Sequence, residues 1–583
     1  MRLLPGGRYL ALATLIGALA EPGLAGKLTD KEHTNIEEPR PAGVPSDAVM
    51  EAAGAVIGHI DLDIRNIFNP NDPRENSGLY RLADRLHRRT RPGAIRAQLL
   101  FKSGDRYSAQ KLAETERNLR LLIYIYDANV VPVRYAEGKV DIKVITKDVW
   151  TLTPGISFGR AGGANSTSYD LEDTNFLGWG KSVKLIHSRS VDRTSNAVDY
   201  ADPNVFGSRW ISTLAYVNSS DGHQRTAQFA QPFYSLDTRW SANVLAMSYD
   251  RTVSRYYLGN IVDQFNDNEA TYQLSGGVSS GLVDGWSKRL LFGMYYDQNL
   301  FVPTPTTTLP AKPLPPDRTL SYPFVGFDVV QDDFTKVGDE NEIGRTEDLY
   351  FGTEVTGQVG VSNGVFGAHT NALMLAAAAV HGFKLSDEQQ LFLNWDFSTR
   401  VEDGRAVNLI TDGGAKYYWR WRPDWLLYAS LSATVTDSLD PDMQLLLGGD
   451  NLSVLNAGQL SLVSSGSAGA AAAQPGMRGY PLRYESGESR AILTVEQRVF
   501  TDWYPYRLVR IGAAVFGDVG RTWGSGSVGN SDPGLLRDVG FGFRLGNTRS
   551  GLGNVVHIDF AFPLSNTTGI KHFQFLVQTF RSF

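Results

Sequence analysis

The chain has 583 residues, enough for about three or four ordinary soluble domains or for one large barrel. Its 59 glycines and its 28 Phe, 25 Tyr and 11 Trp residues favour β-structure with many turns. The net charge of -6 is spread without a polybasic block, which excludes a nucleic-acid partner, and the lack of cysteine excludes disulfides and thiolate chemistry.

Residues 1–25 are expected to be a cleaved secretory signal peptide. Two arginines precede an apolar run over residues 9–20, and a small-residue site follows at Gly23-Leu24-Ala25. The alternative is a short membrane anchor, but the run falls short of the ~20 residues that a helical span needs. No later stretch offers ~18 consecutive apolar residues, so the sequence predicts no membrane helix.

Residues 26–54 are polar and contain proline, and they are interpreted as a linker that can hold a short helix near Asp47. Residues 56–147 then show the pattern of one small α/β domain. A strand-like run precedes a helix capped by Ser77, whose apolar face carries Leu79, Leu82 and Leu86. A second helix begins near Ser108, and two strands close the unit.

From residue 150 to the end, apolar and polar side chains alternate with a period of two. In RAILTVEQRV, residues 490–499, Leu493 and Val495 share one face while Thr494 and Glu496 share the other. This alternation predicts a transmembrane antiparallel β-barrel of about 16 strands, with apolar side chains toward lipid and polar ones toward the lumen. A soluble sandwich or propeller is the alternative, but aromatic residues near strand ends favour the membrane.

Two connections are expected to be long extracellular loops. Residues 302–318 are rich in proline, which cannot continue a β-ladder, and residues 451–475 are rich in Ala, Ser and Gly.

No motif argues for an enzyme. Two G-x-S-x-G matches, at residues 277–281 and 360–364, lie between strand-like runs instead of at a strand-to-helix turn. GWGKS at residues 178–182 lacks the first glycine of a phosphate loop, and the histidines show no metal-ligand spacing. No cofactor and no metal are therefore expected.

The most informative motif is MRGYP at residues 477–481, which follows the second long connection. Glu496 and Asp518 lie on the polar faces of the next two strands. A loop folded into the lumen could place the Arg478 guanidinium against both carboxylates and be held there by charge-assisted hydrogen bonds. The spacing of the three residues is equally consistent with an alternative, in which they are ordinary charged side chains that contact water in the lumen.

MRGY resembles the (V/M)-R-G-(F/Y) loop motif of the BamA, TamA and two-partner secretion transporter superfamily, the bacterial surface antigen family. LEDTNFLGWGKSV at residues 171–183 is similar to the family's first-hairpin signature, and FGDVGRTW, DVGFGFRL and IDFAFPL resemble its closing strands. The final KHFQFLVQTFRSF, with Phe573, Phe575 and Phe583, is similar to its C-terminal recognition strand. The resemblance runs from about residue 56 to the C-terminus.

The resemblance implies that residues 56–147 are a POTRA domain and that residues 150–583 form a sixteen-stranded barrel with a weak seam between its first and last strands. It implies that Arg478 holds the loop, that Gly479 and Tyr480 shape its tip, and that Glu496 and Asp518 are the acids it meets. Two features depart from the family pattern: a single POTRA-like unit, and some 25 residues between Asp450 and the motif.

The expected function is insertion or translocation of client polypeptides at the bacterial outer membrane, with the POTRA domain in the periplasm. The partners would be unfolded outer-membrane or secreted clients, the lipid bilayer and accessory periplasmic proteins. A dedicated secretion pore for one exoprotein and a passive structural barrel remain as alternatives.

Overall fold

The computed structural model describes residues 36–304, 314–449, 454–455, 476–524, 534–549, 555–565 and 570–580. The expected signal peptide and the greater part of the 451–475 connection lie outside them. Within the described residues no helix has the length and apolar character needed to cross a membrane.

Residues 36–149 form a small α/β domain around one three-stranded sheet of order β1-β3-β2. Strand β3 runs parallel to β1 and antiparallel to β2. The elements in chain order are α2 (Asp47–Ala52), β1 (Val56–Arg65), α3 (Gly78–Leu86), α4 (Pro92–Arg96), α5 (Ala109–Arg120), β2 (Ile125–Ala136) and β3 (Lys139–Asp148).

Local chemistry sets the limits of these elements. The hydroxyls of Ser77 and Ser108 accept hydrogen bonds from the backbone N–H groups of Tyr80 and Lys111, which caps α3 and α5 at the residues expected from the sequence. Glu137 and Gly138 both have positive φ, 50° and 73°, and this geometry closes the tight β2–β3 turn.

One sequence-based expectation for this region is wrong. Residues 36–54 are not a free linker, because Val44 and the fully buried Met50 join the same core as Leu119 and Ile142. The leucines of α3 do not pack into that core but are exposed. The apolar periodicity located the helix correctly but could not say what its apolar face contacts.

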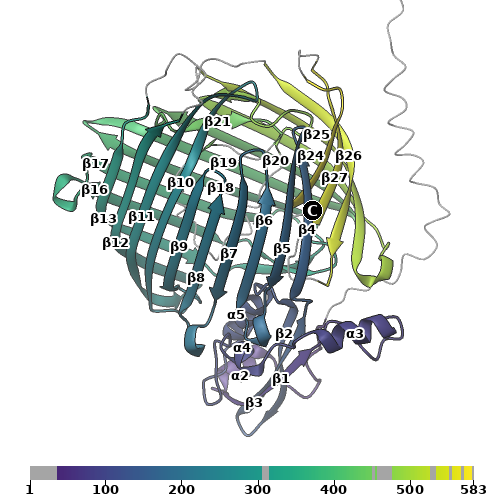
Figure 1. The fold of residues 1–583 in the computed structure, drawn as a ribbon. Helices are drawn as coiled ribbons and strands as arrows, with labels where there is room; N and C mark the ends of the chain where they lie inside the picture. Colours follow the sequence, from purple (N-terminus) through teal and green to yellow (C-terminus); the bar gives the residue numbers. More distant parts are fainter. Residues whose placement is uncertain are drawn as a thin grey trace, which may run out of the picture. The chain divides into compact units, whose positions relative to one another are not determined.

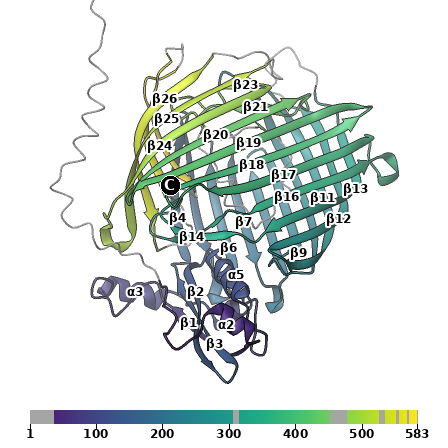
Figure 2. The ribbon, with the colours of Figure 1, turned by 180° about the vertical axis from the view of Figure 1, so that it is seen from behind.

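The remaining chain forms one closed antiparallel β-barrel, as expected, but with 20 strands and not about 16 (Figures 1 and 2). The estimate had merged neighbouring strand-like windows that the structure keeps apart. The number is even because the strands pair antiparallel throughout the closed circuit. The barrel strands are β4 (Leu152–Ala161), β5 (Ala164–Asp173), β6 (Ser182–Arg189), β7 (Thr194–Asp202), β8 (Ile211–Ser219), β9 (Gly222–Gln231), β10 (Trp240–Tyr257), β11 (Asn260–Val283), β12 (Trp286–Pro303), β13 (Arg318–Gln331), β16 (Thr353–Ser362), β17 (Ala372–Lys384), β18 (Gln389–Glu402), β19 (Arg405–Arg422), β20 (Trp425–Asp437), β24 (Ser489–Phe500), β25 (Val509–Trp523), β26 (Leu536–Asn547), β27 (Val555–Pro563) and β28 (Gln574–Phe580).

The barrel wall has an apolar exterior and a polar interior. On β24, Leu493 and Val495 are exposed outward while Thr494 and Glu496 are buried inward, and β27 alternates in the same way. We call the end at which β4 begins the proximal end and the opposite end the distal end. Exposed aromatic residues gather at the proximal ends of strands and in the proximal turns: Trp179, Phe206, Trp240, Trp421, Trp503 and Tyr506. An apolar wall with such an aromatic girdle is typical of a barrel embedded in a bilayer.

Two connections between barrel strands contain additional strands. The proximal connection from β13 to β16 forms a hairpin of β14 (Phe334–Gly338) and β15 (Thr346–Tyr350). The distal connection from β20 to β24, here called the long loop, contains β21 (Gln444–Leu447), β22 (Val454–Leu455) and β23 (Glu485–Gly487). Short 3-10 turns lie at Phe176–Gly178, Val205–Gly207, Gly364–Phe366 and Pro505–Arg507.

Candidate functional site in the barrel lumen

The long loop places Arg478 against the inner wall of the barrel. Its Nε and Nη2 donate hydrogen bonds of 2.7 and 2.8 Å to the two carboxylate oxygens of Asp518, and its Nη1 donates one of 2.5 Å to Glu496. The guanidinium carbon lies 3.3 Å from the ring centroid of Phe516. The structure thus brings together the arginine and both acids that the sequence pointed to, and the Arg478 side chain is 0% exposed.

Further charges surround this contact and complete a closed network. Arg498 donates to Glu496 over 3.1 Å, and Arg544 donates to Asp559 over 2.5 Å. The Arg478 guanidinium also lies 3.7 Å from Asp559. All of these groups are buried, and in a water-poor site such pairs are strong only when each charge keeps a partner.

The two residues after Arg478 fix the tip of the long loop. The Gly479 backbone N–H donates to the Asp538 carboxylate over 3.0 Å, and a Cβ at position 479 would stand 2.7 Å from the Asp538 Cβ. The Tyr480 hydroxyl donates to the Arg537 carbonyl over 2.9 Å and lies 3.0 Å from the Ser565 hydroxyl. Glycine at position 479 is therefore needed for a close approach of loop and wall.

The same loop also reaches the strands that form the other side of the seam. Gly162, in the β4–β5 turn, lies so close to Leu482 that a Cβ there would overlap the Leu482 backbone nitrogen. The Gly449 N–H donates to the Pro481 carbonyl over 2.8 Å, which holds the two limbs of the loop together. The loop is therefore in contact with the β4–β5 turn on one side of the seam and with β25 and β26 on the other.

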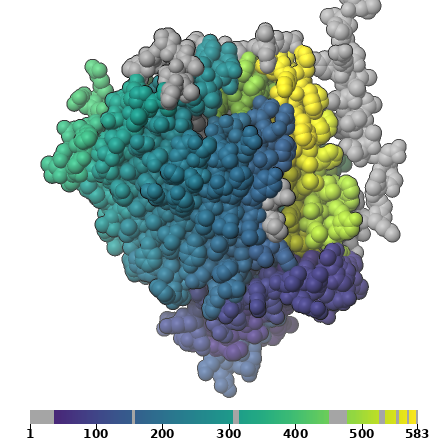
Figure 3. All heavy atoms as spheres, viewed as in Figure 1, coloured from purple at the N-terminus to yellow at the C-terminus, as the bar shows by residue number. Residues whose placement is uncertain are grey.

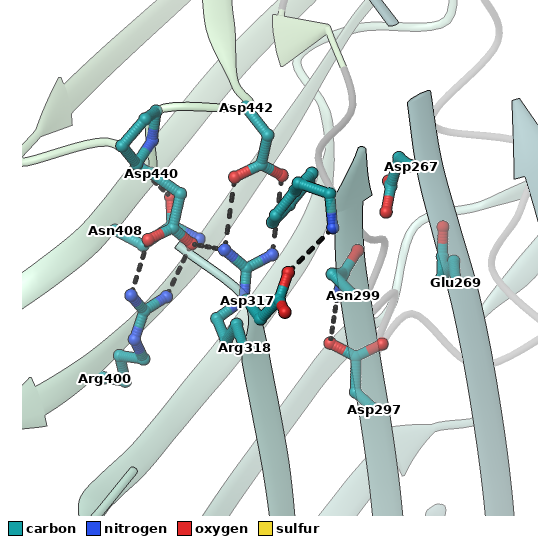
Figure 4. Close-up of polar contacts among 12 residues, drawn as sticks. Asp267, Glu269, Asp297, Asn299, Asp317, Arg318, Arg400, Asn408, Asp440 and Asp442 are labelled. Carbon is teal, nitrogen blue, oxygen red and sulfur yellow. Dashed lines mark hydrogen bonds and ion pairs between the residues drawn. The ribbon is translucent and has the colours of Figure 1, made fainter. Parts of the chain in front are cut away.

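A second anchor holds the start of the long loop, and sequence reasoning missed it. Asp440 accepts two hydrogen bonds, of 2.6 and 2.5 Å, from Arg400 on β18, and Asp442 lies 3.2 Å from Arg318 on β13 (Figure 4). Here the loop provides the acids and the wall provides the arginines. The Asp-Pro-Asp run was the available signal, but its partners lie on strands far away in the sequence.

The β14–β15 hairpin enters the lumen from the proximal end. Its Ile343, 3% exposed, packs in one cluster with Tyr418, Leu426 and Phe500 of the wall. The Tyr418 hydroxyl donates to the Asn341 side chain over 2.8 Å. The hairpin therefore crosses from the β13–β16 side of the lumen to strands β19, β20 and β24.

The α/β domain holds this hairpin by ion pairs and hydrogen bonds. Arg120 of α5 donates to both carboxylate oxygens of Asp348, over 2.7 and 2.6 Å. The Thr346 hydroxyl donates to Asp127 of β2 over 3.0 Å, and Lys336 pairs with Glu116 of α5. These contacts connect the domain directly to the segment that fills the proximal lumen.

In the part of the chain that the structure describes, the seam between the first and last strands is short. Among the described residues, β28 and β4 share one paired position, Val577 with Arg160, whereas β27 and β28 stay in register from Val555 with Phe580 to Ala561 with Gln574. The blue first strands and yellow last strands meet on the face drawn in Figure 3. Phe573 is exposed just before β28, Phe575 lies on β28, and Phe583 lies outside the described residues.

No group of three or more metal-ligating side chains occurs among the residues that the structure describes. The buried charges of the lumen pair with one another, and their arrangement is suited to holding protein segments in place.

The fold and the site define a class: a closed antiparallel barrel with the exterior of a membrane protein, an α/β domain before it, and a distal loop held in its lumen by a buried arginine. The chain is similar to CdiB from Escherichia coli, at 13% identity and a TM-score of 0.44 over 91% of this chain and 77% of that one. It is similar to CdiB from Acinetobacter baumannii at 13% identity and a TM-score of 0.37, over 90% and 73% of the two chains. It is also similar to BamA from Haemophilus ducreyi lacking POTRA domains 1-3, at 14% identity and a TM-score of 0.33, over 90% and 85%. No protein-family model and no curated sequence matches the chain.

Proposed function

We propose that this protein is an outer-membrane insertase or translocase of the BamA and two-partner secretion type, in which a POTRA-like domain at residues 56–147 receives an unfolded client in the periplasm. The observation that carries the proposal is the seam, where β4 and β28 share a single paired position among the described residues. An edge with unpaired backbone N–H and C=O groups can add a client strand.

The long loop and the β14–β15 hairpin occupy the lumen, which supports a route for the client along the seam. The long loop is held by buried ion pairs at one end, and the hairpin is packed among apolar wall residues at the other. Free passage through the lumen would require both segments to leave, whereas parting of the seam breaks few ladder hydrogen bonds among the described residues of β4 and β28. Strand exchange at this edge needs neither a nucleotide nor a cofactor.

A cysteine crosslink tests the seam directly, because the native chain has no cysteine. Val577→Cys combined with Arg160→Cys would bridge the seam, and Val577→Cys combined with Ile558→Cys would bridge the ordinary β27–β28 pair. The proposal expects that oxidation abolishes client assembly in the first variant and that reduction restores it. Full activity of the oxidised seam variant would overturn the lateral route.

Depletion of the protein, followed by profiling of the outer membrane, separates the candidate functions. A general loss of barrel proteins supports insertion. Loss of one secreted protein supports a dedicated secretion pore, and an unchanged profile supports a passive barrel.

A further inference from the structure

Helix α3 exposes an apolar face that nothing in the described chain covers. Leu79, Leu82 and Leu86 are 68%, 48% and 66% exposed. They recur at helical spacing, so their side chains form one stripe along the helix. Three exposed leucines on one short helix are an interaction surface rather than scattered surface residues.

The flank of α3 next to the leucine stripe is basic. Arg81 and Arg85 are exposed and follow the same helical period one face away from the leucines, and the exposed Arg88 comes just after the helix ends. A third face attaches the helix to the protein, where the Asp84 carboxylate accepts from the Phe68 N–H over 3.3 Å and Tyr80 stacks on Phe68 at 4.5 Å. Apolar and cationic side chains arranged in this way are typical of a helix lying in a bilayer interface.

The position of α3 also points to the bilayer interface. The Tyr80 hydroxyl donates to the Tyr506 carbonyl over 2.7 Å, so the helix abuts the proximal turn between β24 and β25. Trp503 and Tyr506 of that turn are exposed members of the aromatic girdle. Arg549, beside the next proximal connection, donates to the Ile67 carbonyl over 2.9 Å and pairs with Glu75, which holds the segment before α3 against the barrel.

We propose that α3 is an interfacial membrane helix that binds the lipid leaflet next to the proximal end of the barrel. Its leucines enter the boundary between head groups and acyl chains, and its arginines contact anionic phosphates. The inference rests on the proposed location of the barrel in a membrane. It assigns to the α/β domain a lipid contact of its own, which would fix that domain at the membrane surface beside the last barrel strands.

Site-specific labelling of the cysteine-free chain tests this inference. A polarity-sensitive fluorophore is attached to Leu82→Cys, and the full chain is reconstituted in vesicles of phosphatidylethanolamine and phosphatidylglycerol. Lipids that carry a quencher in the upper acyl chain report contact. Leu493→Cys on the outer wall of β24 is the positive control, and Lys139→Cys, exposed on the domain, is the negative control.

We expect quenching at position 82 that approaches the value at position 493, with none at position 139. Adding Leu79→Ser and Leu86→Ser should at least halve the quenching at position 82, and omitting the anionic lipid should weaken it. Quenching at 493 with none at 82 would overturn the inference while the membrane location stands. Absence of quenching at 493 would overturn the membrane location itself.

Discussion

Arg478 and Asp518 meet through two parallel hydrogen bonds, although one belongs to a distal loop and the other to the middle of strand β25. A guanidinium matches a carboxylate in this fork geometry, and lysine cannot reproduce it. The contact lies in a site without solvent exposure, so its loss should strongly weaken the attachment of the long loop to the barrel wall.

We expect Arg478→Ala to leave a folded, heat-modifiable barrel but to release the long loop. Removal of Arg478 leaves Asp518 as a buried charge without its guanidinium partner, whereas Glu496 keeps Arg498. Loss of one partner of a buried ion pair costs roughly 3–5 kcal/mol. Protease cleavage within the long loop should therefore become at least about a hundredfold faster. Arg521→Ala, an exposed arginine on the outer face of β25, is the control and should leave cleavage unchanged. Unaltered cleavage in Arg478→Ala would remove the holding role.

The two anchors of the long loop should act independently. Asp440→Asn removes the ion pairs with Arg400 and Arg318, and its effect on loop cleavage should add to that of Arg478→Ala because the two sites share no partner. A double-mutant cycle between Arg400 and Asp440 should instead show a coupling energy of roughly 0.5–3 kcal/mol. Strong coupling between Arg478 and Asp440 would show that the loop is released as one unit.

The hairpin should limit ion flow through the barrel. Replacing residues 334–350 with a short Gly-Ser linker removes Ile343 and its neighbours from the lumen, and we expect the conductance of the purified protein in planar bilayers to rise several-fold. Arg120→Ala should increase the frequency of open events, because Asp348 and Glu116 then lose their shared cation. Lys384→Ala, which breaks an exposed ion pair in a neighbouring proximal turn, should have no effect.

The contact between the α/β domain and the hairpin should depend on pH through Asp127. Burial raises the pKa of Asp127 from 3.8 to about 6, against the opposing charge of Arg120. The folded state therefore prefers the protonated acid. This contribution to stability is fully present below about pH 4 and is lost as the pH rises toward 6. Asp127→Asn should slow hydrogen exchange in β2 relative to the native chain at pH 7 and leave little difference at pH 4. Equal exchange at both values would contradict the assignment.

The strand alternation predicted most of the fold because it is a local property. Leu493 and Thr494 have opposite environments as neighbours on one strand, and no distant information is needed to see it. The number of strands was harder to predict. Alternation does not mark where one strand ends and the next begins, so neighbouring windows were merged and the estimate was too low.

The candidate site could be predicted in part, because some of its residues are marked by local patterns and others are not. Glu496 and Asp518 were found because strand faces and the MRGY motif both pointed to them. Asp440 and Asp442 were not, since Arg400 and Arg318 come near them only when the barrel closes. The leucines of α3 show a further limit: a helical period predicts an apolar face, but the surface that covers this face is not encoded in the period.

The long loop holds both sides of the seam by charge. Toward β25 and β26 it is fixed by the ion pairs of Arg478 and by the Gly479–Asp538 hydrogen bond. Toward the first strands, Arg483 donates to both carboxylate oxygens of Asp192 in the β6–β7 turn, over 2.7 Å each. A loop attached to both sides spans the seam at its distal end, so the strands should part first at the proximal end of β4, and full opening should require one of the two sets of ion pairs to break.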